Sequence, residues 1–94
     1  MIDWDRVDEL RHEVGEEDFE EVADMFFEEV EEVLATLGNT DTLARDLHYL
    51  KGSALNLGFT QLATLCREGE TDQPKIADIR AEYAAAKAEL TSAV

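Results

Sequence analysis

The residues best suited to take part in a chemical reaction lie in a stretch whose apolar spacing predicts a helix over residues 41–57. Apolar residues recur there in steps of three and four and define a buried face: Leu43, Leu47, Leu50, Ala54 and Leu57. At about 100° per residue, His48 points roughly 140° away from that face, toward solvent. Lys51 and Gly52 follow one helical turn later and are therefore its neighbours on the helix surface. Leu55, one heptad beyond His48, completes an exposed patch.

A patch of this composition is suited to receiving a phosphoryl group and handing it on. A neutral imidazole nitrogen attacks phosphorus directly and forms an N–P bond, and the Lys51 ammonium can neutralise the phosphoryl oxygens. The chain has no G-x-x-x-x-G-K-[ST] loop for ATP and no carboxylate cluster placed around His48 to hold a metal. We therefore expect the chain to bind no cofactor, with Mg²⁺ and an acidic pocket supplied by a partner protein.

Gly52 is an unusual residue for the middle of a helix, where it costs about 1 kcal/mol relative to Ala. Two structural explanations are close packing against another helix and simple tolerance of a weak position. The spacing places Gly52 away from the buried face, and this favours a third explanation. A side chain at this position would obstruct whatever approaches His48.

The elements that must position this patch are read from apolar spacing. Besides 41–57, it predicts helices over 3–13, 17–37, 61–70 and 75–91, separated by short connections. The long helix over 17–37 has a predicted core line with two further apolar residues beside it: Phe19, Val22, Phe26, Val30, Val33 and Leu37, with Ala23 and Leu34. Short connections make successive helices antiparallel. We therefore expect one all-α domain over 1–94, an up-down antiparallel four-helix bundle with a short additional N-terminal helix.

The charge balance excludes several classes of partner. The chain has 23 acidic and 8 basic residues and a formal net charge of −15, whereas nucleic acids and anionic membranes require a basic surface. Residues 1–32 alone hold 15 acidic and 2 basic residues; this acidic face keeps the protein soluble or repels wrong partners. The sequence shows no membrane-spanning run and no signal peptide, and its one cysteine cannot form an internal disulfide. We expect a cytoplasmic protein.

The segment from His48 to Phe59, HYLKGSALNLGF, closely resembles the H-x-L-K-G-S-x-x-x-L-G signature of histidine phosphotransfer (Hpt) domains. The resemblance extends to a short first helix and long acidic second helix within 2–37, and to a fourth helix around 62–66. It implies that His48 carries the phosphoryl group, that Lys51 is the base beside the phosphate and that Gly52 admits the partner. Many members have a Gln 22 residues after the His, which orients the imidazole; Glu70 stands there in this chain and could take that role.

The resemblance implies a phosphoryl carrier rather than a turnover enzyme. It would take the group from a receiver-domain aspartate, or from a histidine kinase, and pass it to another receiver. One alternative is an acidic module that only docks receivers; another is a piece cut from a larger sensor kinase. We expect a monomer that docks its partner on Ala44, Gly52, Leu55 and Phe27, although Phe27 lies about 80° from its helix's core line and edge-of-core packing is the competing interpretation.

Two further residues of reactive types, a histidine and a cysteine, are explained without a functional role. His12 ends an E-x-x-H string that begins at Glu9, a spacing used by di-iron bundles. Such bundles need that string twice, with further inward carboxylates, and the inward positions here are apolar. We interpret His12 as a solvated side chain and Cys66 as a small core residue.

Overall fold

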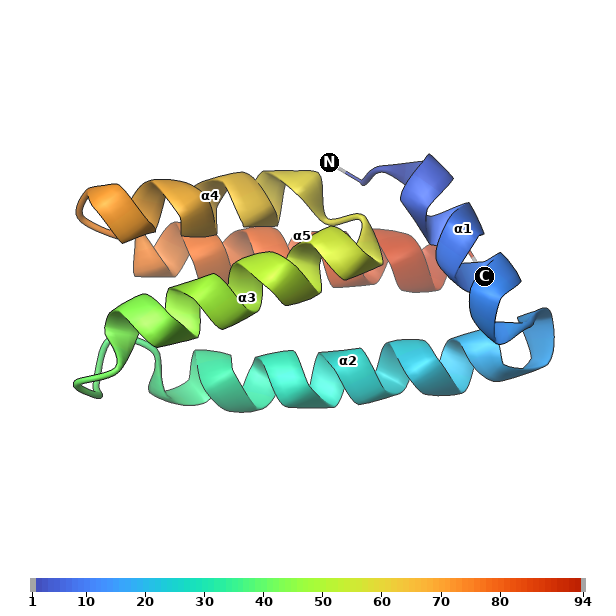
Figure 1. Ribbon diagram of the computed structural model, residues 1–94, viewed down its shortest axis with the longest axis horizontal. Helices are drawn as coiled ribbons and strands as arrows, with labels where there is room; N and C mark the ends of the chain where they lie inside the picture. Colours follow the sequence, from blue (N-terminus) through green and yellow to red (C-terminus); the bar gives the residue numbers. More distant parts are fainter. Residues whose placement is uncertain (1, 94) are drawn as a thin grey trace.

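The computed structural model describes residues 2–93 and contains five α-helices within them (Figure 1). They are α1 (Trp4–Val14), α2 (Glu16–Thr36), α3 (Leu43–Leu57), α4 (Thr60–Thr71) and α5 (Ile76–Ser92). The described part of the chain has no strand, only an isolated bridge between Ile2 and Phe59. The all-helical class and the five helices predicted from the sequence are confirmed, with ends displaced by one or two residues. No helix in 2–93 combines the length and apolarity that crossing a membrane requires.

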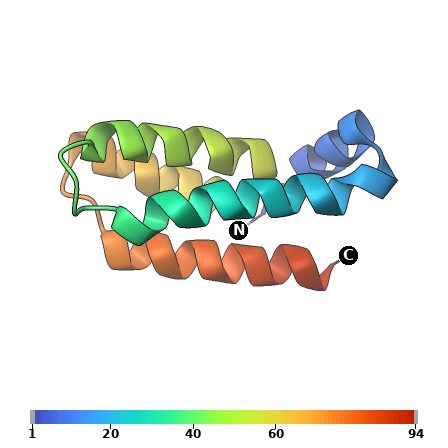
Figure 2. The same ribbon diagram turned by 90° about the horizontal axis from the view of Figure 1, so that it is seen from below.

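The four longer helices lie side by side along the long axis of the molecule, and α1 lies across one end (Figures 1 and 2). α3 packs against α4 on one side and against α2 on the other, while α5 packs against α4. α1 contacts both α2 and α3. α3 is therefore flanked by two helices and keeps one side free for solvent, and this side carries the predicted patch.

The buried face of α3 matches the predicted one. Leu47, Leu50, Ala54 and Leu57 are each 1% exposed, and only Leu43, at the start of the helix, is partly buried. They belong to one hydrophobic core with buried residues of α4 and α5: Leu62, Ala63, Cys66, Ile79, Tyr83, Ala86 and Leu90. Because this face is buried on neighbouring helices, the opposite side of α3 is fixed toward solvent.

The predicted core line of α2 is only partly right: Phe19, Val30 and Leu37 are buried, whereas its other members are only partly buried because the helix is rotated toward Phe27. Phe27 is only 4% exposed, whereas Phe26 is partly buried at the edge of the core. The Phe27 ring stacks on Phe59 at a centroid distance of 6.4 Å and meets Tyr83 edge-on at 6.3 Å. Two adjacent lines of apolar residues run along α2, and the aromatic rings contributed by the rest of the chain decide which of them faces inward.

The end of α3 is tied to the N-terminal segment. Gly58 adopts a left-handed conformation with φ of +78°, and its carbonyl accepts a 2.6 Å hydrogen bond from the Asp3 amide. The Arg6 Nε donates to the Asn56 carbonyl at 3.1 Å. The last carbonyls of a helix have no partner within the helix, so Arg6 of α1 and Asp3, the residue that caps α1, satisfy two acceptors where α3 ends.

Candidate functional site

His48 lies near the middle of α3 on its free side, and its side chain is 76% exposed. Lys51 is one turn further along the same helix and is 24% exposed. Glu70 comes from the last part of α4, the helix that packs beside α3, and is 22% exposed. The imidazole is thus the most accessible of the three side chains, and the other two form its partly covered flank.

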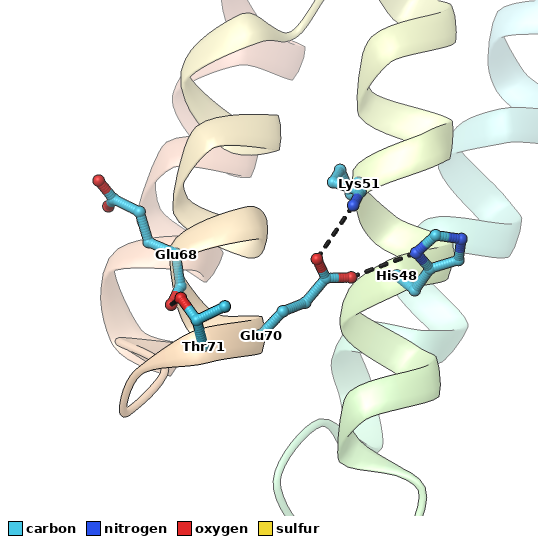
Figure 3. A network of polar contacts seen from close by, with 5 residues as sticks. All are labelled: His48, Lys51, Glu68, Glu70 and Thr71. Atoms are coloured by element: carbon cyan, nitrogen blue, oxygen red, sulfur yellow. Dashed lines mark hydrogen bonds and ion pairs between the residues drawn. The ribbon is translucent and has the colours of Figure 1, made fainter.

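The Glu70 carboxylate bridges the other two side chains (Figure 3). Its Oε1 lies 3.2 Å from Nδ1 of His48, and its Oε2 accepts a 3.0 Å hydrogen bond from Nζ of Lys51. The hydrogen bond from Lys51 and its positive charge lower the pKa of Glu70 from its usual value of 4.5, and His48 contributes in the same direction. Glu70 is therefore ionised at neutral pH and can only accept hydrogen bonds.

This contact sets the tautomer of the imidazole. A carboxylate beside Nδ1 requires the proton on Nδ1, where it can be donated, and a neutral imidazole then has its lone pair on Nε2. In Figure 3 the second ring nitrogen of His48 points away from Glu70. In the neutral form of the ring, the nitrogen on the open side of the helix is then the unprotonated one, and this nitrogen is suited to nucleophilic attack.

Gly52 is exposed and does not pack against another helix. A Cβ built on its backbone would have no atom within 4 Å beyond the helix's own neighbouring backbone. This geometry excludes close packing as the reason for glycine at this position. Ala44 is exposed on the same helix, and Leu55 is 53% exposed. Small or apolar residues therefore lie on both sides of the imidazole along α3, beside the charged side chains of Arg45 and Lys51.

Comparison with protein-family models gives a match to the Hpt domain over residues 21–93. The chain belongs to the Hpt domain family. Comparisons with curated proteins and with solved structures gave no match. Hpt domains are phosphocarrier modules of two-component signalling, in which they transfer phosphoryl groups through histidine and interact with receiver domains and histidine kinases. The match begins inside α2, so the whole of α1 lies outside it.

Three of the residues singled out from the Hpt signature and its neighbourhood come together in space. Glu70 is 22 residues from His48 in sequence, and the packing of α4 on α3 brings its carboxylate to the imidazole. Phe27 does not join them, because it is buried between Phe59 and Tyr83. The expectation that it docks a partner is therefore wrong. It lies within the core, deeper than the edge-of-core position that was the competing interpretation. His12 is exposed on α1, and Cys66 is fully buried in the core.

Sequence reasoning missed an aromatic residue beside His48. Tyr49 is 38% exposed, and its hydroxyl donates a 3.1 Å hydrogen bond to the carboxylate of Glu29 on α2. Met25, one turn before Glu29, is 56% exposed. The adjacency of Tyr49 to His48 was visible in the sequence, but the pairing with Glu29 depends on how α2 lies against α3.

Proposed function

We propose that this Hpt domain relays a phosphoryl group between aspartates of receiver domains, or from a histidine kinase to a receiver, as a phosphohistidine at His48. The observation that carries the proposal is the state of the imidazole. Its Nδ1 is held by the ionised Glu70, while its Nε2 faces open solvent on an exposed helix. The contact of Nδ1 with Glu70 orients the ring, and the open surroundings of Nε2 leave that nitrogen free to react.

The chemical step balances without any further group from this chain. The Nε2 lone pair attacks the phosphorus of an aspartyl phosphate, an N–P bond forms, and the P–O bond to the aspartate breaks. The aspartate carboxylate leaves with the electron pair. The ring is then positively charged, with its proton remaining on Nδ1 beside the Glu70 carboxylate. Transfer to the next receiver is the reverse reaction on a different aspartate.

Lys51 and Glu70 act together in this proposal. A carboxylate near an incoming phosphoryl group would repel it, but the Glu70 charge is offset by the Lys51 ammonium at 3.0 Å. The pair can therefore orient the ring without adding net negative charge beside the phosphorus. Lys51 also lies one turn from His48, within reach of the phosphoryl oxygens once the group has arrived.

The receiver supplies what this chain does not offer. Mg²⁺ prefers several oxygen ligands in an octahedral arrangement, and within residues 2–93 no group of three His, Cys, Asp or Glu side chains could hold a metal ion. We assign the Mg²⁺ and the acidic pocket of the transfer reaction to the partner receiver, with no nucleotide required by the Hpt domain itself. His48, Lys51, Gly52 and Glu70 are then the site, with Ala44 and Leu55 in the docking surface.

We further propose that residues 1–94 act as one monomeric domain, in which α2 to α5 form an up-down antiparallel bundle. The short connections between successive helices and the course of the chain in Figure 1 support this arrangement. The alternative of a module that only docks receivers would not need the contact between Glu70 and His48. That contact favours a working phosphoryl carrier.

The test of this function is phosphoryl transfer from a panel of radiolabelled phosphorylated receiver domains. We expect at least one receiver to lose its label to the Hpt domain within the lifetime of its aspartyl phosphate. Mg²⁺ and ATP without a receiver or kinase should give no label. Transfer from none of the receivers, or robust labelling by ATP alone, would contradict the proposal.

A further inference from the structure

A groove runs beside His48 between α2 and α3, and the proposed transfer chemistry makes no use of it. The groove is a hollow of about 380 Å³, and Tyr49, the residue after His48, forms part of its α3 wall. Glu29, Glu32 and Val33 line it from α2. Because Tyr49 directly follows the nucleophile in α3, a receiver that reaches His48 would lie next to this groove.

The groove is acidic and its α2 wall is not neutralised. Three carboxylates, those of Glu29, Glu32 and Asp46, face one guanidinium, that of Arg45. Asp46 accepts hydrogen bonds from the hydroxyls of Thr40 and Thr42. Within residues 2–93, no ion pair joins a Lys or Arg to Glu29 or Glu32. The partner of Glu29 is the neutral Tyr49 hydroxyl. Burial raises the pKa of Tyr49, and the nearby charges of Glu29 and Glu32 raise it further, so its hydroxyl keeps its proton and remains a donor.

The surface around His48 therefore has two zones with different charge. The α3 zone holds Gly52 and Leu55 and is apolar, with Lys51 at its edge. The α2 zone is strongly acidic, because α2 carries ten acidic residues and no basic ones over Glu16–Thr36. A partner with an acidic reaction centre fits the first zone, but the surface next to that centre must carry positive charge to fit the second.

We propose that the groove accepts a Lys or Arg side chain of the docked receiver domain, and that Glu29 and Glu32 thereby select receivers with a basic residue next to their active site. The inference rests on the proposed function, since it names a feature of the partner at the same site. A basic side chain has an aliphatic stem that can lie on Tyr49 and Val33, with its charge between the two carboxylates. A cation over a tyrosine ring is itself favourable.

Two other occupants fit less well. A second copy of this chain would bring another net charge of −15 against an acidic helix. A divalent cation would need a compact set of ligands, and residues 2–93 contain no group of three suitable side chains. Charge complementarity thus favours the basic residue of a receiver.

The test compares two double variants with the same change in charge. Glu29→Lys with Glu32→Lys reverses the groove, and Glu17→Lys with Glu21→Lys reverses two exposed acids in the N-terminal half of α2. Glu17 is 12 residues from Glu29 along the helix, a separation of about 18 Å at 1.5 Å per residue. The readout is the second-order rate of transfer from the receiver that labels the wild-type protein fastest, measured between roughly 0.01 and 1 M NaCl.

We expect the groove variant to lose at least 10-fold in rate at low salt and to lose most of the salt dependence, within the range known for electrostatic steering of about 10–10³-fold. The matched control should lose less than about 3-fold, and both should melt as cooperatively as the wild type. Reversing the charge of one basic receiver residue should then restore part of the transfer rate of the groove variant, and should not do so for the matched control.

Equal losses in the two double variants would overturn the groove as the determinant, because the general charge of α2 would then explain the effect. Wild-type rates in the groove variant would also overturn it, while leaving phosphoryl transfer through His48 intact. A wild-type protein that takes no label from any receiver would overturn the proposed function and this inference together.

Discussion

Replacing Gly52 should separate stability from activity. The glycine has a helical conformation within α3, and an added Cβ would meet no atom within 4 Å. Nothing in the fold therefore offsets the cost of glycine in a helix, about 1 kcal/mol relative to Ala. Gly52→Ala should raise the free energy of unfolding by about that amount. For a domain of this size, the gain corresponds to a rise in Tm of about 4–8 °C.

The matched control is the other helical glycine near the site. A Cβ at Gly69 of α4 would lie 2.9 Å from Cβ of Pro74 and 3.3 Å from Cδ1 of Leu47. Gly69→Ala should therefore lower the Tm, although it gains the same intrinsic helix propensity as Gly52→Ala. Thermal unfolding followed by circular dichroism measures both variants.

The same position should control access to His48. Gly52→Ala adds one methyl group and should keep most of the transfer rate, whereas Gly52→Gln projects a longer side chain beside the imidazole and should block transfer. Both variants should be more stable than the wild type. A Gly52→Ala protein that is less stable than the wild type would refute the packing analysis. A Gly52→Gln protein that transfers at the native rate would refute the role in access.

Lys51→Ala should slow transfer by roughly 10-fold, or about 1.4 kcal/mol in barrier, without abolishing labelling; an unchanged rate would remove its electrostatic role. Glu70→Gln should retain the contact with the imidazole and more of the rate than Glu70→Ala, and equal rates would argue against positioning. Lys51 lowers the pKa of Glu70 below 4.5. The ion pair between them therefore stabilises the folded state fully above pH 4.5, and this stabilisation is lost as the pH falls through the lowered pKa. Glu70→Gln should flatten the dependence of Tm on pH below 4.5. Burial raises the pKa of Cys66 to about 11, so its thiol should react with a thiol reagent at pH near 8 only as fast as the domain unfolds, and rapid native-state labelling would contradict this.

The orientation of α3 could be predicted from the sequence because its apolar residues leave only one choice. Leu47, Leu50, Ala54 and Leu57 form a single line with no competing line beside it. The exposed position of His48 follows from that line and elementary helix geometry. The exposed position of Gly52 follows in the same way, so most of the site on α3 is local information.

The orientation of α2 was not predictable in the same way. Phe26 and Phe27 are adjacent, and both lie on plausible core lines of the helix. The choice between them depends on Phe59 and Tyr83, which come from distant parts of the chain. The orientation of α2 follows from packing against these distant aromatic rings, so it cannot be predicted from the spacing within α2 alone.

The contact between Glu70 and His48 also depends on non-local packing. Apolar spacing shows that α4 forms, but not which of its polar residues lies beside α3. The resemblance to other Hpt domains pointed to position 70, and the structure places its carboxylate between Nδ1 of His48 and Nζ of Lys51. The groove at Tyr49 had no such guide, because it depends on how α2 and the loop before α3 lie beside that helix.

The most direct test of the central claim is to locate the phosphoryl group on the labelled protein. After transfer from a phosphorylated receiver, we expect a label that is stable in base and labile in acid, and that mass spectrometry under mild conditions assigns to His48. His48→Gln should take no label and should keep its Tm, because the side chain is 76% exposed. His12→Gln should be labelled like the wild type. A label that persists at the native rate in His48→Gln would contradict the account.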